Sequence, residues 1–429
     1  MKGFYSLWIL LFAYQVSLSQ HSPVPTPPQP SSLTPHRVGT FPFGTVNPLS
    51  PTRYQSRTQQ QNQALIQKDF QQNQRNQALL PEIERTERGL IQYELPSYQG
   101  ASGTDFYNQA FEEIEQMLEG VTNLDLQKAV FLTENAYLDN HFTATWWQKH
   151  IDAALKQIYG AMEYEGYARD NIMAKKMFLH RYMADTLTVY NDNGVPTTTY
   201  PVKYDFSDIF GKKNWTKMFV TKLLNSRSGQ CHSMPLLYLI LADRLGIDAW
   251  FSYSPQHSYI RLQDDTGAWY NLELTNGHYS SDAWIVGSGY IEADALRHGI
   301  YMDTLSRKET IASMLVDLAQ GYKHKYGYDS FVLQCVEEAL KYFPKNIVAL
   351  QLRSDYHTLL LRYVVAQLGY PPLSKLSAYP KAYALYQQCR QLYAQIDAYG
   401  YEHMPEEVYS AWLASLENQK EKQVQFPRP

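Results

Sequence analysis

The sequence predicts an α+β fold in which helices precede, and a short antiparallel sheet follows, one buried helix that starts just after a cysteine. Apolar residues recur densely from Met234 to Leu245, as expected for a helix buried on most sides, and Gly246 follows as a C-cap. After a strand-like run at residues 249–253, two further runs flank a turn at residues 264–267, which predicts a hairpin. Residues 301–422 carry almost wholly helical patterns and form a separate C-terminal region.

The first 19 residues have the pattern of a secretory signal peptide. Lys2 supplies a positive start, residues 5–16 an apolar run, and Ser17 to Ser19 small residues for cleavage before Gln20. The apolar run is shorter than the ~20 residues that a membrane helix needs, and no later run is long enough. We therefore expect an exported protein without a transmembrane segment after signal removal: periplasmic, associated with the cell envelope, or extracellular.

Residues 20–100 are rich in proline, glutamine, serine and asparagine. This composition cannot bury enough apolar surface to offset the entropy of ordering, so it predicts a disordered linker, with a nascent helix in its Gln-rich half. Folded structure is expected from residue 101.

The region 101–300 forms the predicted α+β domain. Its first part carries helical apolar spacing, followed by a strand-like run and a short helix that leads to the cysteine. Glu134 and the tryptophans near it are interpreted as packing or capping residues. The expected helices span residues 106–118, 124–137, 146–159, 169–190 and 215–224, and the expected strand spans residues 198–205.

The C-terminal region is predicted to contain helices at residues 330–343, 346–368, 380–399 and 406–420. Ala339-Leu340, followed by Pro344 and Asn346, resembles the end of a tetratricopeptide repeat, whose stacked helix pairs form a concave surface for protein partners. The alternative is an ordinary helical bundle. The resemblance implies a protein partner on these helices.

The hairpin brings a histidine and a carboxylate to one face of the sheet. Side chains alternate between faces along a strand, so His257 lies on the face opposite Ile260, as does Glu273 on the second strand. If the loop has an odd number of residues and Leu262 lies opposite Ala268, His257 lies directly across from Glu273. Cross-strand neighbours are about 5 Å apart, close enough for an imidazole–carboxylate hydrogen bond.

Cys231 completes the parts of an activated cysteine nucleophile. A polar turn at residues 226–229 delivers it to the start of the buried helix, where the helix end and a nearby imidazolium favour a thiolate. The alternative is a small residue buried in the core. Asn271 lies on the same face as Glu273 and is an alternative partner for His257. His232 is expected to point away from a cleft that Cys231 faces, and His278 lies beyond the hairpin.

These residues resemble the transglutaminase-like superfamily of papain-related cysteine enzymes. Glu273 stands where the family has Asp, and Leu274 where it has Pro. The resemblance implies that Cys231 is the nucleophile, His257 the base and Glu273 the orienting acid. The matching motifs are Gly229-Gln230-Cys231, Leu245-Gly246-Ile247-Asp248-Ala249, His257-Ser258-Tyr259 and Trp269…Glu273-Leu274-Thr275.

Three further residues are expected near the reacting groups. Gln230 and the backbone N–H of Cys231 are candidate donors to an oxyanion, and Tyr259 and Trp269 are expected to form walls of the site. Together these residues predict an exported acyl-transferase or hydrolase acting on amide or peptide bonds of a protein or peptide through a thioester. The alternative is a catalytically inactive binding module of the cell envelope.

Other chemistries find no support in the sequence. The net charge of −4 provides no basic footprint for nucleic acid. There is neither an H-E-x-x-H nor a C-x-x-C motif, and no Gly-rich phosphate loop, so neither a metal nor another cofactor is expected. Cys335 and Cys389 either pair with each other or are buried core thiols, which leaves Cys231 as the unpaired cysteine.

Overall fold

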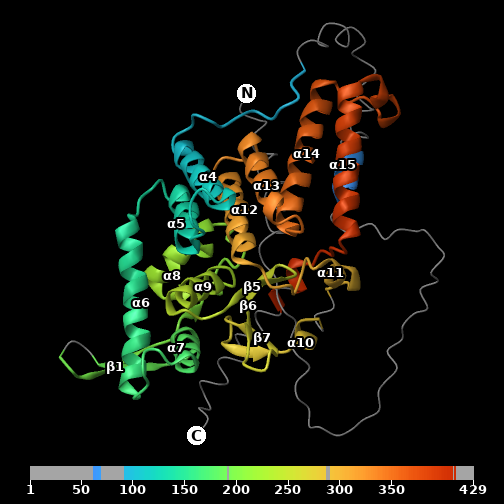
Figure 1. Ribbon diagram of the computed structural model, residues 1–429. Coiled ribbons are helices and arrows are strands. Elements are labelled where there is room, and N and C mark those ends of the chain that lie inside the picture. The colour runs from blue at the N-terminus through green and yellow to red at the C-terminus, as the bar shows by residue number, and fades with distance from the viewer. Residues whose placement is uncertain (1–60, 69–90, 191–192, 287–289, 409, 412–429) are drawn as a thin grey trace, which may run out of the picture.

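A computed structural model describes residues 61–68, 91–190, 193–286, 290–408 and 410–411 of the chain (Figure 1). The predicted signal peptide at residues 1–19, most of the predicted linker and most of the predicted helix at residues 406–420 lie outside the described residues. The architecture is mixed helix and sheet, as the α+β prediction requires at this level.

The helices before the cysteine surround one central helix. α9 (Ser233–Leu245) is buried almost throughout, from Ser233 to Ala242, and Gly246 closes it in a left-handed conformation (φ 68°). The helices α5, α6, α7 and α8 pack around α9, and two strands of the main sheet contact it as well. The preceding helices are α4 (Thr104–Glu119), α5 (Leu126–Tyr137), α6 (Ala144–Tyr164), α7 (Ile172–Ala184), the 3-10 turn η3 (Trp215–Met218) and α8 (Val220–Ser226).

The main sheet follows α9 directly. Its four antiparallel strands are β5 (Trp250–Ser254), β6 (His257–Gln263), β7 (Trp269–Glu273) and β8 (His278–Ser280), hydrogen-bonded in that order. Both faces of the sheet are buried near the start of β6 and the end of β7, whereas Trp269 and Tyr270 at the other end are each 40% exposed. The buried end is therefore the one that faces α9 and the rest of the core.

Short strands also precede α9, which the sequence analysis did not expect in full. The helix predicted at residues 169–190 is wrong in its last part: α7 ends at Ala184, and β1 (Leu187–Tyr190) pairs with β2 (Pro196–Thr199) as an antiparallel hairpin. β-branched and aromatic residues favour a strand there. The strand predicted at residues 198–205 is divided into β2 and β3 (Lys203–Tyr204), which pairs in parallel with β4 (Ser228–Gly229).

The C-terminal helices pack one on the next. α10 (Asp282–Val286) and α11 (Ala293–His298) are short, and α12 (Arg307–Lys325), α13 (Ser330–Tyr342), α14 (Ile347–Gln367) and α15 (Pro380–Ala398) are long, with the 3-10 turn η4 (Leu373–Ala378) before α15. α12 contacts α13, α13 contacts α14, and α14 contacts α15 (Figure 1). Such an order occurs in both helical bundles and helical repeats, so the tetratricopeptide resemblance stays a prediction.

The hydrophobic core passes through the predicted boundary at residue 300. α12 packs against α4 and α5 as well as against α13, and one cluster of buried side chains extends from the N-terminal helices to Tyr401. Parts of the predicted disordered segment also join the structure: residues 61–68 are helical with Ile66 buried, and the Tyr98 backbone N–H donates to Asp329 at 2.8 Å. No helix among the described residues is both long and apolar enough to span a membrane.

Candidate functional site

Cys231 lies two residues before the first residue of α9, in the turn that leads into the helix. The turn is fixed by the backbone N–H of Met234, which donates to the carbonyl of Gln230 at 3.0 Å, and by the Gln230 N–H, which donates to Ser233 Oγ at 3.0 Å. The Ser258 hydroxyl donates to the carbonyl of Cys231 at 2.7 Å. Cys231 is thus held between the N-terminal end of α9 and strand β6, and it is only 2% exposed.

His257 and Glu273 are joined by a hydrogen bond between His257 Nε2 and Glu273 Oε2. The other carboxylate oxygen, Oε1, accepts from the Thr275 backbone N–H at 2.8 Å and from the Thr275 hydroxyl at 2.5 Å. The side chains of His257 and Glu273 are almost completely buried. Both oxygens of Glu273 are therefore occupied, which fixes the orientation of the His257 ring.

The strand register that produces this contact differs from the predicted register by two residues. Leu262 pairs with Tyr270 rather than with Ala268, because the loop between β6 and β7 spans five residues, 264–268, and its centre lies one residue later than expected. His257 therefore meets Glu273 diagonally across the hairpin. A diagonal pair is longer than a direct pair but remains within reach of long side chains, and the glutamate reaches the imidazole.

The charges of these groups support one another. Burial disfavours the imidazolium, but the charge of Glu273 and hydrogen bonds with Cys231 and Glu273 outweigh burial and raise the pKa of His257. Burial opposes the Glu273 carboxylate as well, yet His257 and the bonds from Thr275 hold the pKa of Glu273 below its ordinary value. The structure thus brings Cys231, His257 and Glu273 into one buried constellation with a charged histidine–carboxylate pair.

Gln230 lies beside the cysteine, but its amide group binds a neighbouring loop. The Nε2 group donates to the carbonyls of Asp205 at 3.2 Å, Ser207 at 3.3 Å and Asp208 at 3.4 Å, and the residue is fully buried. In this conformation its side-chain donors bind the loop, so the predicted role of Gln230 as an oxyanion donor would require the side chain to leave these carbonyls.

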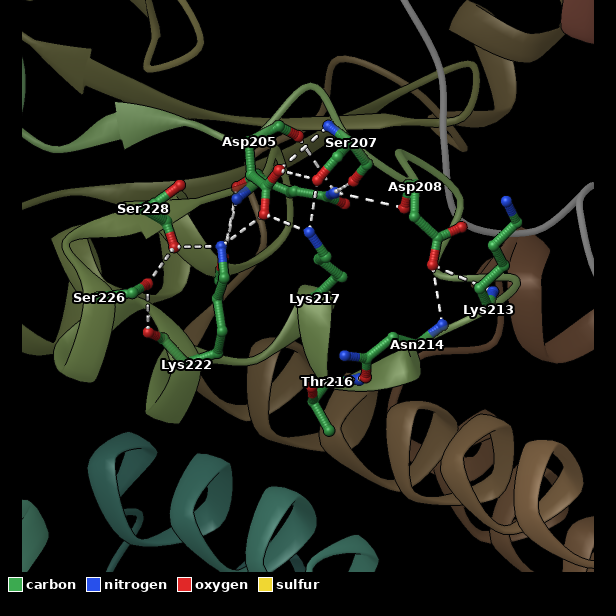
Figure 2. A network of polar contacts seen from close by, with 12 residues as sticks. Asp205, Ser207, Asp208, Lys213, Asn214, Thr216, Lys217, Lys222, Ser226 and Ser228 are labelled. Atoms are coloured by element: carbon green, nitrogen blue, oxygen red, sulfur yellow. Dashed lines mark hydrogen bonds and ion pairs between the residues drawn. The ribbon is translucent and has the colours of Figure 1, made fainter.

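The loop bound by Gln230 is itself fixed by an ionic network. Figure 2 shows Lys217 and Lys222 converging on Asp205, with Nζ–Oδ2 distances of 2.8 and 2.7 Å. Burial works against the carboxylate, but these lysines and Ser207 hold the pKa of Asp205 well below its ordinary range. The network joins the residues before Cys231 to the segment at residues 205–217.

The two aromatic residues predicted as walls occupy different environments. Tyr259 is buried in β6 opposite Ser252 of β5. Trp269 is 40% exposed at the far end of β7, where its ring packs against Trp250 with centroids 5.0 Å apart. Asn271, the alternative partner for His257, instead donates to Asp282 at 2.7 Å. Glu273 is therefore the residue that contacts His257.

A small cavity of about 40 Å³, lined by both polar and apolar side chains, lies beside His257. A water molecule needs roughly 10–15 Å³ of such space, so the cavity has room for about three. Ser254, whose hydroxyl has no hydrogen-bond partner among the residues that the structure describes, is part of the lining. The lining also includes His257, Ser258, His232, Asp317 and Tyr401.

A second histidine–carboxylate pair, which was not predicted from the sequence, lines this cavity. His232 was expected to point away from a cleft that Cys231 faces. Cys231 is not among the residues that line this cavity, whereas His232 is, and His232 Nε2 lies 3.0 Å from Asp317 Oδ2. Burial disfavours its charged form, yet Asp317 and Cys231 raise the pKa of His232. No sequence signal indicates Asp317, because α12 reaches α9 only through tertiary packing.

Glu134 is a capping residue, as the sequence analysis interpreted it. Its carboxylate, from α5, accepts from the backbone N–H groups of Val220 at 2.6 Å and Thr221 at 2.8 Å, and from the Thr221 hydroxyl at 2.6 Å. These groups belong to the N-terminal end of α8, which has no side-chain cap of its own. Burial raises the pKa of Glu134 to about 7, against the effect of these hydrogen bonds.

The other cysteines are separate buried thiols. None of the three cysteines forms a disulfide, and Cys335 in α13 and Cys389 in α15 are buried in the core. Of the two alternatives for Cys335 and Cys389, the structure therefore has buried core thiols. Burial raises the pKa of the Cys335 thiol and raises that of Cys389 to about 12. Within the described ranges, no group of three or more His, Cys, Asp or Glu side chains is arranged to hold a metal ion.

Comparison with known proteins gives no relative: no family model, no curated protein and no solved structure matches this chain.

Proposed function

We propose that the protein is an exported cysteine enzyme that transfers or hydrolyses acyl groups at amide or peptide bonds, with the transglutaminase-like arrangement of its catalytic residues. The observation that carries this proposal is the buried hydrogen bond between His257 and Glu273, on a strand whose next residue, Ser258, is bound to the carbonyl of Cys231. A thiol beside an imidazolium at the start of a helix is the arrangement in which a cysteine acts as a nucleophile.

In the proposed reaction, the Cys231 thiolate attacks the carbonyl carbon of an amide. The C–N bond breaks, His257 donates its proton to the leaving amine, and a thioester forms on Cys231. Water or a second amine then attacks the thioester while His257 accepts a proton, which regenerates the thiolate. Glu273 holds the imidazole in one orientation through both steps, since its carboxylate is fixed by Thr275.

The test combines alkylation with a substrate screen. We expect iodoacetamide to modify Cys231 at mildly acidic pH in the wild type and far more slowly in His257→Ala, because an ordinary thiol ionises near ~8.5. Amide substrates presented as protein or peptide should be turned over by the wild type and not by Cys231→Ala. Modification that follows an ordinary thiol titration in both proteins would contradict the proposal.

A second candidate is a binding module of the cell envelope without catalytic activity. Its support is the burial of the constellation: the His257 side chain is 0% exposed, and the adjoining cavity holds only about 40 Å³. The two candidate functions predict different effects of the substitution Cys231→Ser. A binding module keeps its ligand affinity with serine and forms no covalent adduct with an electrophilic glutamine mimic, whereas the enzyme forms an adduct and loses it with the substitution.

A further inference from the structure

The chain returns to the candidate site after its last long helix. Following α15, it turns at Gly400 in a left-handed conformation (φ 76°) close to α11, where a Cβ atom would lie 2.5 Å from the backbone nitrogen of Ala295. Only glycine allows this approach without displacement of the helix. Residues 401–406, which we call the strap, then extend from α11 toward β5 and β6 (Figure 1).

The strap contacts the immediate surroundings of His257. Tyr401 lines the cavity beside His257. The Met404 carbonyl accepts a 2.5 Å hydrogen bond from Nε2 of Gln256, the residue directly before His257. Met404 itself is 1% exposed. Because Met404 precedes Pro405, its backbone is restricted to extended conformations, which suits a segment lying along a groove.

The far end of the strap is held by charge. Both carboxylate oxygens of Glu406 lie 2.8 Å from Lys212 Nζ, in the segment that follows the loop bound by Gln230. The strap therefore contacts one element next to His257 and another next to the loop that supports the Cys231 turn. An aromatic side chain, a backbone carbonyl and a carboxylate are thus among its points of attachment.

We propose that the strap occupies a peptide-binding groove beside the triad, and that this groove takes extended peptides carrying an aromatic residue and, five positions later, a carboxylate. The strap is the intramolecular occupant and reduces access to Cys231. Ser254, buried in the cavity wall with a hydroxyl that no described residue binds, provides a polar contact for an incoming peptide. Peptide binding stands independently of catalysis, whereas the use of such peptides as substrates rests on the proposed function.

The first experiment reverses the charges of the Lys212–Glu406 pair in the full-length protein. The rate of iodoacetamide modification is measured by mass spectrometry on the peptide that contains Cys231. Glu406→Lys and Lys212→Glu should each raise this rate about threefold to tenfold, since each replaces an attraction by a repulsion, and the double exchange should return it toward the wild-type rate. Both side chains are about one-third exposed, so the fold tolerates their exchange.

A matched control reverses a charge elsewhere. Asp152 forms a comparable surface pair with Arg244, at 2.9 Å, and Asp152→Lys should leave the modification rate of Cys231 unchanged. The melting temperature of each variant is measured as well, because it distinguishes release of the strap from unfolding of the whole protein. Equal modification rates in the wild type, both single variants and the double exchange would overturn the inference, even if the enzyme turned over a substrate.

The second experiment tests the ligand chemistry directly. A synthetic peptide with the sequence of residues 399–408 is added to the Glu406→Lys protein, in which Lys212 is free to accept a carboxylate from another chain. This peptide should slow modification of Cys231 in a saturable manner, and the same peptide with lysine in place of its Glu406 should do so several-fold less effectively. No protection by either peptide, or equal protection by both, would overturn the proposed specificity.

Discussion

The Ser258 hydroxyl donates a 2.7 Å hydrogen bond to the carbonyl of Cys231, so the residue that follows the histidine is bound to the cysteine residue itself. Both groups are buried. This bond crosses from β6 to the turn before α9 and therefore links the two elements that carry the reacting side chains. The distance between thiol and imidazole depends on this link as well as on the packing of the helix against the sheet.

Ser258→Ala should affect reactivity more than stability. Loss of the bond should lower the free energy of unfolding by about 1–3 kcal/mol, because the Cys231 carbonyl loses its hydroxyl partner. The altered cysteine–histidine geometry should lower kcat with little change in KM, and slow alkylation of Cys231 at acidic pH. Denaturant titration and steady-state kinetics measure the two effects.

The control for this prediction is Thr133→Val, which removes another buried hydroxyl-to-carbonyl bond between two elements. Thr133 Oγ1 lies 3.3 Å from the Met314 carbonyl, between α5 and α12. This variant should lose stability with no change in the reactivity of Cys231. Equal losses of reactivity in the two variants would contradict a positioning role for Ser258.

Glu273→Gln should destabilise the protein in a pH-dependent way. The raised pKa of His257 contributes stability that is complete below its ordinary value of 6.5 and is lost as pH rises through the folded pKa. The lowered pKa of Glu273 contributes stability that is complete above its ordinary value of 4.5 and is lost as pH falls through the folded pKa. The ion pair therefore stabilises most between these two values.

The measurement is the free energy of unfolding of wild type and Glu273→Gln at several pH values. The difference should be largest, about 3 kcal/mol or more, near pH 5.5, because one partner of a buried ion pair has been removed, and should shrink in alkaline solution. A control is Glu113→Gln, which removes a surface pair with Lys128 and should change stability by less than about 1 kcal/mol. A difference that is constant with pH would show that His257 and Glu273 do not form a charged pair.

The sequence predicted the elements around the site because their signals are local. The apolar run from Met234 to Leu245 and its glycine cap match α9 from Ser233 to Leu245, and the hairpin strands are formed as expected. The alternation of side chains along β6 and β7 was sufficient to place His257 and Glu273 on one face. The predicted register is wrong by two residues, but a shift of two residues keeps each side chain on its face of the sheet. His257 and Glu273 are therefore still in contact.

Features that depend on packing between distant segments were not predictable in the same way. Asp317 reaches His232 because α12 packs near α9, and residues 401–406 reach Gln256 after more than a hundred intervening residues. The amide of Gln230 has three carbonyls within reach only because the segment before η3 folds over it. Neither periodicity nor capping motifs contain information about such contacts, which form only when the whole chain is folded.

Glu134→Ala should destabilise the protein strongly, because the carboxylate of Glu134 satisfies the start of α8. Its removal leaves the backbone N–H groups of Val220 and Thr221 buried without a partner, at about 1–3 kcal/mol for each. Glu134→Gln keeps one acceptor oxygen and should lose less. Chemical denaturation gives both values, and a loss below 1 kcal/mol for the alanine variant would contradict the capping role.

Gly229→Ala should destabilise the turn that presents Cys231, for a steric reason. A Cβ atom at Gly229 would lie 2.5 Å from Leu223 Cδ1 and 2.9 Å from Met234 Cγ, so these buried side chains of α8 and α9 must shift. Overpacking of this kind lowers stability by about 1–3 kcal/mol. The displacement also reaches Cys231, two residues later, so alkylation at acidic pH should slow in the folded variant.

The same substitution in α6 provides a control of opposite sign. A Cβ at Gly160 would lie 3.7 Å from atoms of Val189, an ordinary van der Waals distance, and alanine is the better helix former by about 1 kcal/mol. Gly160→Ala should therefore raise the free energy of unfolding and leave the reactivity of Cys231 unchanged. If Gly229→Ala were as stable and as reactive as the wild type, the close approach of α8 and α9 at Gly229 would not be what positions the cysteine.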